Sequence, residues 1–342
     1  MSSPPNQSGP ASRGKVIYHG RSNVTGSGWP VVIFLVITAG VIAVLWRGHV
    51  LPFARLQATT GPAYTGTDTL RAISFASDGQ GWIAGDNGVL LHLTNGTWTQ
   101  AVAPTRAAFN GIALAAGGAG WAVGDGGTIA QLSGGAWKTV VSPAKVSLNA
   151  VALASATEGW AVGDDGTIAA LHNGIWSLAP TPTSENITGV ALISATSGWA
   201  VTAGGKLLYL QNGTWTLSPI SFAPTPLTSI SFSQGEGWIC GSNGLLVHNA
   251  SVNTGTTWTL TPGNTKTLLN AVAVAAPGEA WAAGDNGTLL HYLSGQWTPI
   301  TSPTSANLRA IAMLSSAEGW AVGDGGVILH YANSTWTKIN GS

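Results

Sequence analysis

The chain has 342 residues, of which only 8% are charged, and its formal net charge at pH 7 is zero. All 13 acidic residues lie between Asp68 and Asp324, whereas five of the 13 basic residues precede position 68. From residue 68 onward 13 acidic residues therefore face 8 basic ones, a balance of −5 that argues against a nucleic-acid partner, because phosphate binding requires a basic surface. Cys240 is the only cysteine, so the chain forms no internal disulfide, and its small apolar position predicts a buried thiol.

The first 68 residues read as a tail, a membrane anchor and a linker. Residues 1–28 are rich in Ser, Pro and Gly, carry three basic residues and no acid, and are predicted to be disordered. Residues 29–46 are uncharged, end in Trp29 and Trp46, and span about 27 Å as a helix, which predicts a transmembrane segment at the short end of the range. The basic tail places the N-terminus in the cytoplasm and exports everything after the linker, residues 47–68.

A cleavable signal peptide is the alternative interpretation of residues 29–46. The long segment before the apolar run and the lack of an A-x-A cleavage site after it favour an uncleaved anchor.

Fourteen tryptophans recur in step over residues 69–339. Successive members of each series lie 39 residues apart, except for one interval of 43 that four extra residues near Asn249–Thr254 produce. A period close to 40 indicates a repeat architecture with seven units. The two series are Trp82, Trp121, Trp160, Trp199, Trp238, Trp281 and Trp320, and Trp98, Trp137, Trp176, Trp215, Trp258, Trp297 and Trp336.

Each unit divides into four short runs with strand character. In the last unit these runs are Leu308–Leu314, Gly319–Gly323, Val327–Tyr331 and Thr335–Ile339, separated by clusters of Gly, Asp, Asn and Ser that are typical of tight turns. No sustained helical period occurs in residues 69–339. The sequence therefore predicts an all-β, seven-bladed β-propeller of four-stranded antiparallel blades, held together by buried tryptophans and closed by packing, with no strand exchanged between its ends.

The turn between the second and third runs contains a recurrent aspartate followed by Asn, Asp or Gly and then Gly. These sequences need positive φ, which Gly and Asn tolerate. The aspartates are expected to cap their turns; a catalytic carboxylate pair is disfavoured because they recur at equivalent places in separate blades. They are Asp86, Asp125, Asp164, Asp285 and Asp324.

A polar residue begins the first run of every unit, where it is expected to line the mouth of the central channel. These residues are Arg71, Asn110, Asn149, Thr188, Thr228, Asn270 and Arg309. Ring closure brings the first and last units together, so Arg71 and Arg309 are candidates for binding a carboxylate or another anion. The alternative is that each arginine pairs with the aspartate of its own turn. The candidate partner-binding set is Arg71, Arg106, Asn110, Asn149, Asn270 and Arg309.

The sequence offers no convincing catalytic, metal or cofactor site. Four histidines occupy equivalent positions in different units, where they diverge around the ring and are expected to be solvated: His92, His248, His291 and His330. No G-x-S-x-G motif is present to position a nucleophile. We therefore expect no enzyme activity and no cofactor.

The recurring motif G-W-(A/I)-(V/A)-G-D-x-G-(T/V)-(I/L)-L-H-(Y/L), followed by N-G-T-W, resembles the photosystem II assembly and stability factor family within the sialidase-type (BNR/Asp-box) propellers. The resemblance covers residues 69–339 and implies a non-catalytic scaffold that binds protein partners on the outer side of a membrane. Complete Asp boxes read S-x-D-x-G-x-T-W, whereas this chain retains remnants such as Leu132–Trp137. The arginine triad and tyrosine–glutamate pair of sialidases cannot be placed among Arg71, Arg106 and Arg309.

We therefore expect a membrane-anchored, exported propeller that binds a protein partner. A carbohydrate-binding protein, either a lectin or a degenerate glycosidase, is the alternative that selective binding on a glycan array would favour, and a ligand-sensing ectodomain is a third. Specificity is expected in the loops from strand four to strand one of the next unit, because these vary most between units. They span Ala101–Asn110, Val140–Asn149, Ala179–Thr188, Ser218–Thr228, Thr261–Asn270 and Ile300–Arg309.

Overall fold

The computed structural model describes residues 45–46, 49–50, 63–251 and 257–339. The chain forms two units, residues 1–57 and 58–342. In the first unit the described residues form one short antiparallel pairing, β1 (Leu45–Trp46) with β2 (His49–Val50). The predicted tail, nearly all of the predicted anchor and most of the predicted linker lie outside the described residues. Within the described ranges, no helix is long and apolar enough to span a bilayer.

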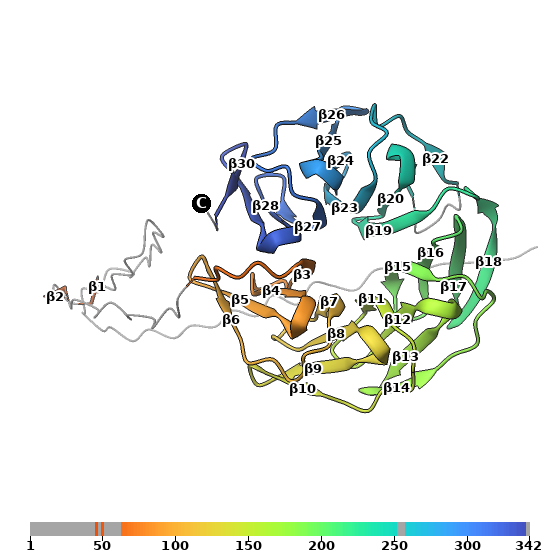
Figure 1. Ribbon diagram of the computed structural model, residues 1–342, viewed down its shortest axis with the longest axis horizontal. Coiled ribbons are helices and arrows are strands. Elements are labelled where there is room, and N and C mark those ends of the chain that lie inside the picture. The colour runs from red at the N-terminus through yellow and green to blue at the C-terminus, as the bar shows by residue number, and fades with distance from the viewer. Residues whose placement is uncertain (1–44, 47–48, 51–62, 252–256, 340–342) are drawn as a thin grey trace, which may run out of the picture. The chain divides into compact units, whose positions relative to one another are not determined.

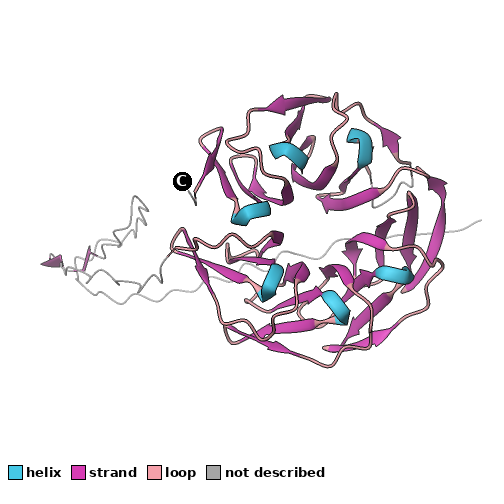
Figure 2. Ribbon diagram, viewed as in Figure 1, coloured by secondary structure: helices cyan, strands magenta, loops and turns pink. Residues whose placement is uncertain are grey.

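The second unit confirms the predicted propeller. Seven four-stranded antiparallel sheets surround a central opening, and in each sheet successive strands of the chain pair with one another (Figure 1). The helical segments in the described part of this unit are short 3-10 turns at one face of the ring (Figure 2). Strand two of every blade is almost wholly buried because it has a strand on each side and a neighbouring blade on each face.

The first four blades are consecutive in the chain. Blade one is β3 (Leu70–Phe75), β4 (Gly81–Gly85), β5 (Leu90–Thr94) and β6 (Thr97–Gln100). Blade two is β7 (Phe109–Leu114), β8 (Gly120–Gly124), β9 (Ile129–Ser133) and β10 (Ala136–Thr139). Blade three is β11 (Leu148–Leu153), β12 (Gly159–Gly163), β13 (Ile168–His172) and β14 (Ile175–Leu178). Blade four is β15 (Ile187–Ser194), β16 (Ser197–Thr202), β17 (Lys206–Gln211) and β18 (Thr214–Ser221).

The remaining three blades follow the same plan. Blade five is β19 (Leu227–Ser233), β20 (Glu236–Gly241), β21 (Leu246–Asn249) and β22 (Thr259–Leu260). Blade six is β23 (Leu269–Ala276), β24 (Glu279–Gly284), β25 (Leu289–Leu293) and β26 (Gln296–Ile300). Blade seven is β27 (Leu308–Ser315), β28 (Glu318–Gly323), β29 (Ile328–Ala332) and β30 (Thr335–Lys338). The extra residues of unit five fall between β21 and β22, where residues 252–256 lie outside the described ranges.

The turn from strand two to strand three is a 3-10 turn in six blades. In blade one its central residues, Asn87 and Gly88, have φ values of 53° and 75°, as the sequence predicts. A Cβ on Gly88 would lie 2.0 Å from the carbonyl oxygen of Thr105, so this turn packs directly on the loop from strand four into the next blade. The turns from strand two to strand three (2→3 turns) and the loops from strand four to strand one of the next blade (4→1 loops) therefore lie on the same face of the ring. The turns are η1 (Asp86–Gly88), η2 (Asp125–Gly127), η3 (Asp164–Gly166), η4 (Ser242–Gly244), η5 (Asp285–Gly287) and η6 (Asp324–Gly326).

The predicted packing role of the fourteen tryptophans is confirmed at every seam between blades. The strand-two indole of each blade meets the strand-four indole of the next blade edge-on. Edge-to-face contact is the favoured geometry for aromatic rings and adds about 0.5–1.5 kcal/mol per pair beyond burial. The pairs are Trp82–Trp137, Trp121–Trp176, Trp160–Trp215, Trp199–Trp258, Trp238–Trp297, Trp281–Trp336 and Trp320–Trp98.

Among the residues that the structure describes, the ring closes between blades seven and one without strand exchange, as predicted. Each of these two blades takes all four strands from its own end of the chain. The packed part of the chain begins before residue 69, inside the predicted linker. Tyr64 is buried, and its N–H donates to the carbonyl of Trp98. Gly66 lies against the turn glycine Gly326 of blade seven, as Thr105 lies against Gly88. Residues 63–69, the entry segment, therefore lead into blade one and pack on the 2→3 turn of blade seven. The 4→1 loops lead into the other blades and pack on the preceding turn in the same way.

Candidate binding site at the channel mouth

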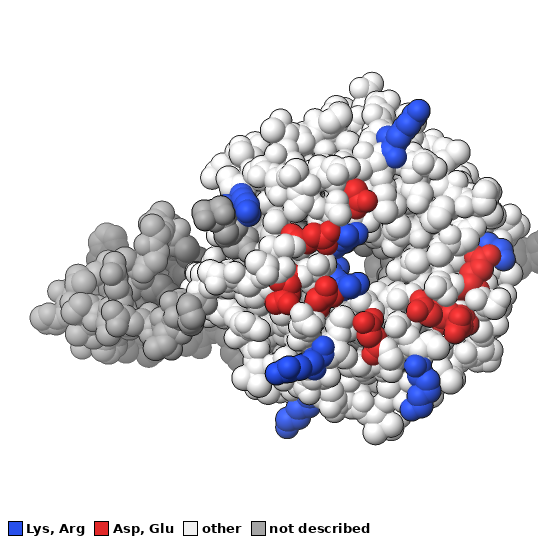
Figure 3. Space-filling view, viewed as in Figure 1, with Lys and Arg blue, Asp and Glu red and all other residues white. Residues whose placement is uncertain are grey.

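A hollow of about 370 Å³ opens at the mouth of the central channel, on the face of the 2→3 turns. Five of the six predicted site residues line it, and Figure 3 shows basic side chains at the central opening with acidic ones beside them. The sixth, Arg106, is exposed on the loop after blade one and does not line the hollow. The lining residues are Arg71, Asn110, Asp125, Ser147, Asn149, Asp164, Asn270 and Arg309.

A β-bulge in every blade positions these side chains. Strand one begins with a fully buried apolar residue, such as Leu70 or Leu148, that pairs with the last residue of strand two, which is a glycine except in blade four. The pairing then skips one residue, for example between Leu148 and Ala150, and the skipped residue is the polar one. A bulge leaves its extra residue outside the ladder and re-aims its side chain. The skipped residues in the seven blades are Arg71, Asn110, Asn149, Thr188, Thr228, Asn270 and Arg309.

The turn aspartates accept hydrogen bonds from these bulge residues, which lie 15 positions earlier in the chain. The Nδ2 atoms of Asn110, Asn149 and Asn270 each lie 2.9 Å from a carboxylate oxygen of Asp125, Asp164 or Asp285. Arg71 donates through Nε to Asp86 in the same way. The expectation that the aspartate side chains cap their own turns was therefore wrong: the backbone N–H that closes each of these turns donates to the main-chain carbonyl of the aspartate, while the carboxylate binds the bulge residue.

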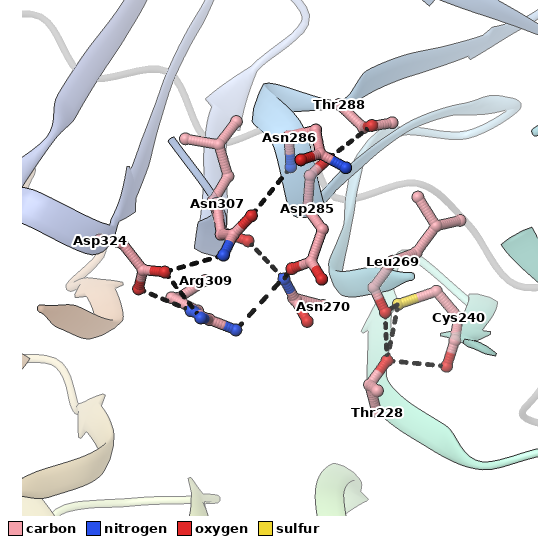
Figure 4. A network of polar contacts seen from close by, with 11 residues as sticks. Thr228, Cys240, Leu269, Asn270, Asp285, Asn286, Thr288, Asn307, Arg309 and Asp324 are labelled. Atoms are coloured by element: carbon pink, nitrogen blue, oxygen red, sulfur yellow. Dashed lines mark hydrogen bonds and ion pairs between the residues drawn. The ribbon is translucent and has the colours of Figure 1, made fainter. Parts of the chain in front are cut away.

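The bulge residues also join consecutive blades. In blades two to six the amide or hydroxyl donates to the carbonyl of the first strand-one residue in the next blade, at 2.6–3.2 Å. Figure 4 shows one such link, from Thr228 to Leu269. Within the described ranges no equivalent bond leaves Arg71 or Arg309. The series of blade-to-blade hydrogen bonds around the channel is therefore interrupted on both sides of blade one.

Arg309 is fully engaged by acidic neighbours (Figure 4). Its Nε and Nη2 atoms lie 2.8 and 2.7 Å from the two carboxylate oxygens of Asp324, and Nη1 lies 3.8 Å from Asp285. Hydrogen bonding from Arg309 holds the pKa of Asp324 below its ordinary value, and the same bond raises the pKa of Arg309. The alternative interpretation, that each arginine pairs with the aspartate of its own turn, is the arrangement observed.

The four strand-three histidines are partly buried against an indole and do not stand free in solvent, so that prediction was wrong. Each stacks on the strand-two indole of its own blade, with ring centroids 4.0–4.4 Å apart. His248 and His291 also lie 2.7 and 2.8 Å from Glu236 and Glu279. The strands pair so that the histidine lies opposite the tryptophan, a register that residue spacing alone does not reveal. In His92, which has no such acid, burial lowers the pKa of the imidazole.

No group of three or more His, Cys, Asp or Glu side chains suited to a metal occurs among the residues with described positions. Cys240 is buried, as predicted, and burial raises the pKa of its thiol to about 12. Its sulfur lies 3.4 Å from the hydroxyl of Thr228 and 3.6 Å from the carbonyl of Leu269. Low thiolate content and lack of access make it a packing residue.

Comparison with known proteins supports the resemblance drawn from the repeats. Residues 168–270, from blade three to the start of blade six, match the model of a family described as photosynthesis system II assembly factor YCF48. A solved structure of YCF48 bound to D1 peptide is similar, with a TM-score of 0.66 and 20% identity over 80% of this chain and 96% of that one. YCF48 from Cyanidioschyzon merolae gives 0.65 and 21% over 80% and 98%.

The fold likeness extends beyond that group. The WD40 β-propeller domain of Doa1 matches with a TM-score of 0.65 and 14% identity, over 79% of this chain and 95% of that one. None of the curated proteins gives a significant match in sequence. The comparisons therefore confirm the propeller fold and a likeness to photosystem II assembly factor propellers, which the family model places in residues 168–270.

Proposed function

We propose that this propeller is a non-catalytic scaffold that binds a segment of a partner protein on the face formed by its 4→1 loops and 2→3 turns. The observation that carries the proposal is the likeness to YCF48, one structure of which holds a D1 peptide, together with the family match over residues 168–270. That structure is similar to this propeller in fold and holds a bound peptide.

The loops on this face have the features of a recognition surface. They are carried by a rigid ring, which lowers the entropic cost of ordering them when a partner binds. Val102 and Val141, at equivalent positions in the first two loops, are 89% and 93% exposed. Large apolar side chains held on a rigid scaffold are typical contacts for a protein segment.

A catalytic role is not part of the proposal. The carboxylates at the mouth belong to separate blades, and each one accepts a hydrogen bond from an arginine or an asparagine amide. General acid–base or nucleophilic chemistry requires paired groups of matched pKa within hydrogen-bond reach of one substrate atom.

Membrane anchoring through residues 29–46, with the N-terminus cytoplasmic and the propeller outside, is the second part of the proposal. It is supported by the uncharged apolar run, its flanking tryptophans and the basic tail. An anchor would confine the scaffold to partners assembled at the same membrane.

Site-specific photo-crosslinking in the native membrane tests the proposed face. A photoreactive amino acid is placed at Arg106, Lys145 or Lys266 in the 4→1 loops, and at Asn95, Asn212 or Asn333 in the 3→4 turns of the opposite face as matched controls. We expect a discrete crosslinked protein from the first set alone. Crosslinks that arise only from the 3→4 turns, or equally from both faces, would refute the assignment.

A further inference from the structure

The seven bulge positions differ in charge although they are equivalent in geometry. Blades seven and one pair the turn aspartate with an arginine, whereas blades two, three and six pair it with an asparagine. Blades four and five have Ala203 and Ser242 in place of the aspartate. The turn aspartates therefore form ion pairs in blades seven and one and are held only by amides in blades two and three. In blade six Asp285 has both an amide and Arg309 as neighbours, and blades four and five lack the aspartate.

In the ion pairs of blades seven and one, one guanidinium retains free donors. Arg309 has all three of its nitrogens facing Asp324 and Asp285. Arg71 uses Nε for Asp86, and its two terminal nitrogens have no hydrogen-bond partner among the described residues. Its side chain is 43% exposed and lines the hollow. Arg71 is therefore the arginine that can meet an incoming carboxylate.

In the sector of blades two and three the unused groups are acceptors. Asp125 and Asp164 both line the hollow, and neither has an ion-pair partner within the described ranges. The Oδ1 atom of Asn110, beside them, is buried and has no hydrogen-bond partner. A buried acceptor left unsatisfied is costly, so a donor supplied by a ligand would relieve it. These three groups suit a cationic donor supplied by a ligand.

We propose that the channel mouth binds a partner segment that carries both a basic side chain and a carboxylate. The lysine or arginine lies between Asp125 and Asp164, and the carboxylate lies on the terminal nitrogens of Arg71. No charged residue of blades four and five lines the hollow: Thr188 and Thr228 direct their hydroxyls to backbone carbonyls, and the charges of Lys206 and Glu185 pair with each other outside it. This inference rests on the proposed function and specifies the chemistry of the segment recognised there.

Selection from a phage-displayed library of random dodecapeptides tests the inference with the propeller unit, residues 58–342, which has its own closed core. Selections use the unaltered propeller, the double variant Asp125→Asn/Asp164→Asn, and Arg71→Gln. Asn keeps an acceptor oxygen for the neighbouring amide, so the local hydrogen bond persists. Asp165→Asn and Arg106→Gln are controls in which the same kinds of substitution each remove one charge from an exposed residue outside the hollow.

We expect the unaltered propeller and both controls to select peptides with a basic and an acidic residue close together. The double aspartate variant loses the basic preference, Arg71→Gln loses the acidic one, and a selected peptide binds the double variant about tenfold or more weakly, equivalent to about 1.4 kcal/mol. Selected peptides without a charge preference, or a preference unchanged in the mouth variants, would overturn the inference and leave the proposed function standing. Failure to select any peptide would overturn both.

Discussion

Trp320 of the last blade and Trp98 of the first meet edge-on, with ring centroids 5.4 Å apart and ring planes at 87°. The six other seams contain the equivalent contact at 4.9–5.6 Å. The seam that joins the two ends of the chain is therefore built like the seams inside the chain. A ring closed in this way holds the mouth residues of blades seven and one in register.

Replacing Trp98 with Ala should therefore destabilise the propeller as much as the same change at an internal seam. Trp98 is 2% exposed and Trp137, its equivalent in blade two, is 6% exposed, so each change should lower the free energy of unfolding by about 3–5 kcal/mol. Urea unfolding of residues 58–342 measures the effect, with the exposed Lys338→Ala as the control. A much smaller loss for Trp98→Ala than for Trp137→Ala would show that the ring is not closed by this contact.

Substitution of two adjacent glycines in the last 2→3 turn separates the cost of positive φ from the cost of a steric clash. Gly325 and Gly326 both have positive φ, 66° and 71°, but only at Gly326 would a Cβ meet the backbone, 2.0 Å from the carbonyl oxygen of Gly66. Gly325→Ala should cost about 1–2 kcal/mol from backbone strain. Gly326→Ala should cost about 1–3 kcal/mol more from the clash. Equal shifts in the thermal unfolding midpoint would contradict the docking of the entry segment on blade seven.

Residue spacing predicted the blades, the turns and the side chains that gather at the mouth, because these depend on local sequence repeated seven times. The finer arrangement depends on strand register, which local sequence does not specify. The bulge that turns Asn149 toward Asp164 is a one-residue shift in pairing. The stacking of His291 on Trp281 likewise depends on which residues lie opposite across two strands. The contact between the bulge residue and the aspartate could have been predicted from their constant separation of 15 residues in the sequence.

The Arg309–Asp324 pair predicts a pH dependence of stability. The folded-state pKa of Asp324 is lowered, so its contribution is present above its unfolded pKa of about 3.9 and is lost as the pH falls through the lower folded value. The stability advantage of the unaltered propeller over Asp324→Asn should thus be constant above about pH 5 and shrink below about pH 4. Chemical unfolding at a series of pH values measures it. An advantage that grows toward acid pH would contradict the ion pair.

The single cysteine offers a probe of local opening. Because burial raises the pKa of Cys240 to about 12, its thiol should stay unmodified by a thiol reagent at neutral to mildly alkaline pH in the native propeller and react fully once the protein is denatured. Thr337→Cys, on an exposed position of the last strand, provides a thiol that should react in the native state. Rapid native labelling of Cys240 would show that blade five opens.

Removal of residues 29–46 should release the protein from membranes. The full chain is expected to remain in the membrane fraction after alkaline carbonate extraction, because an apolar helix of this length resists extraction whereas surface-bound proteins do not. Protease added to the outer side should digest the propeller end and spare a tag on the N-terminus. A full chain found in the soluble fraction, or an N-terminal tag cut first, would contradict the proposed anchor or its orientation.

Hydrogen–deuterium exchange of the full chain, alone and with the partner identified by crosslinking, tests the central claim most directly. If the propeller binds a partner segment on its mouth face, protection on binding should be confined to the 4→1 loops and the 2→3 turns, strongest around Asn110, Asn149 and Arg71. Protection confined to the 3→4 and 1→2 turns, or no change at all on binding, would contradict the account.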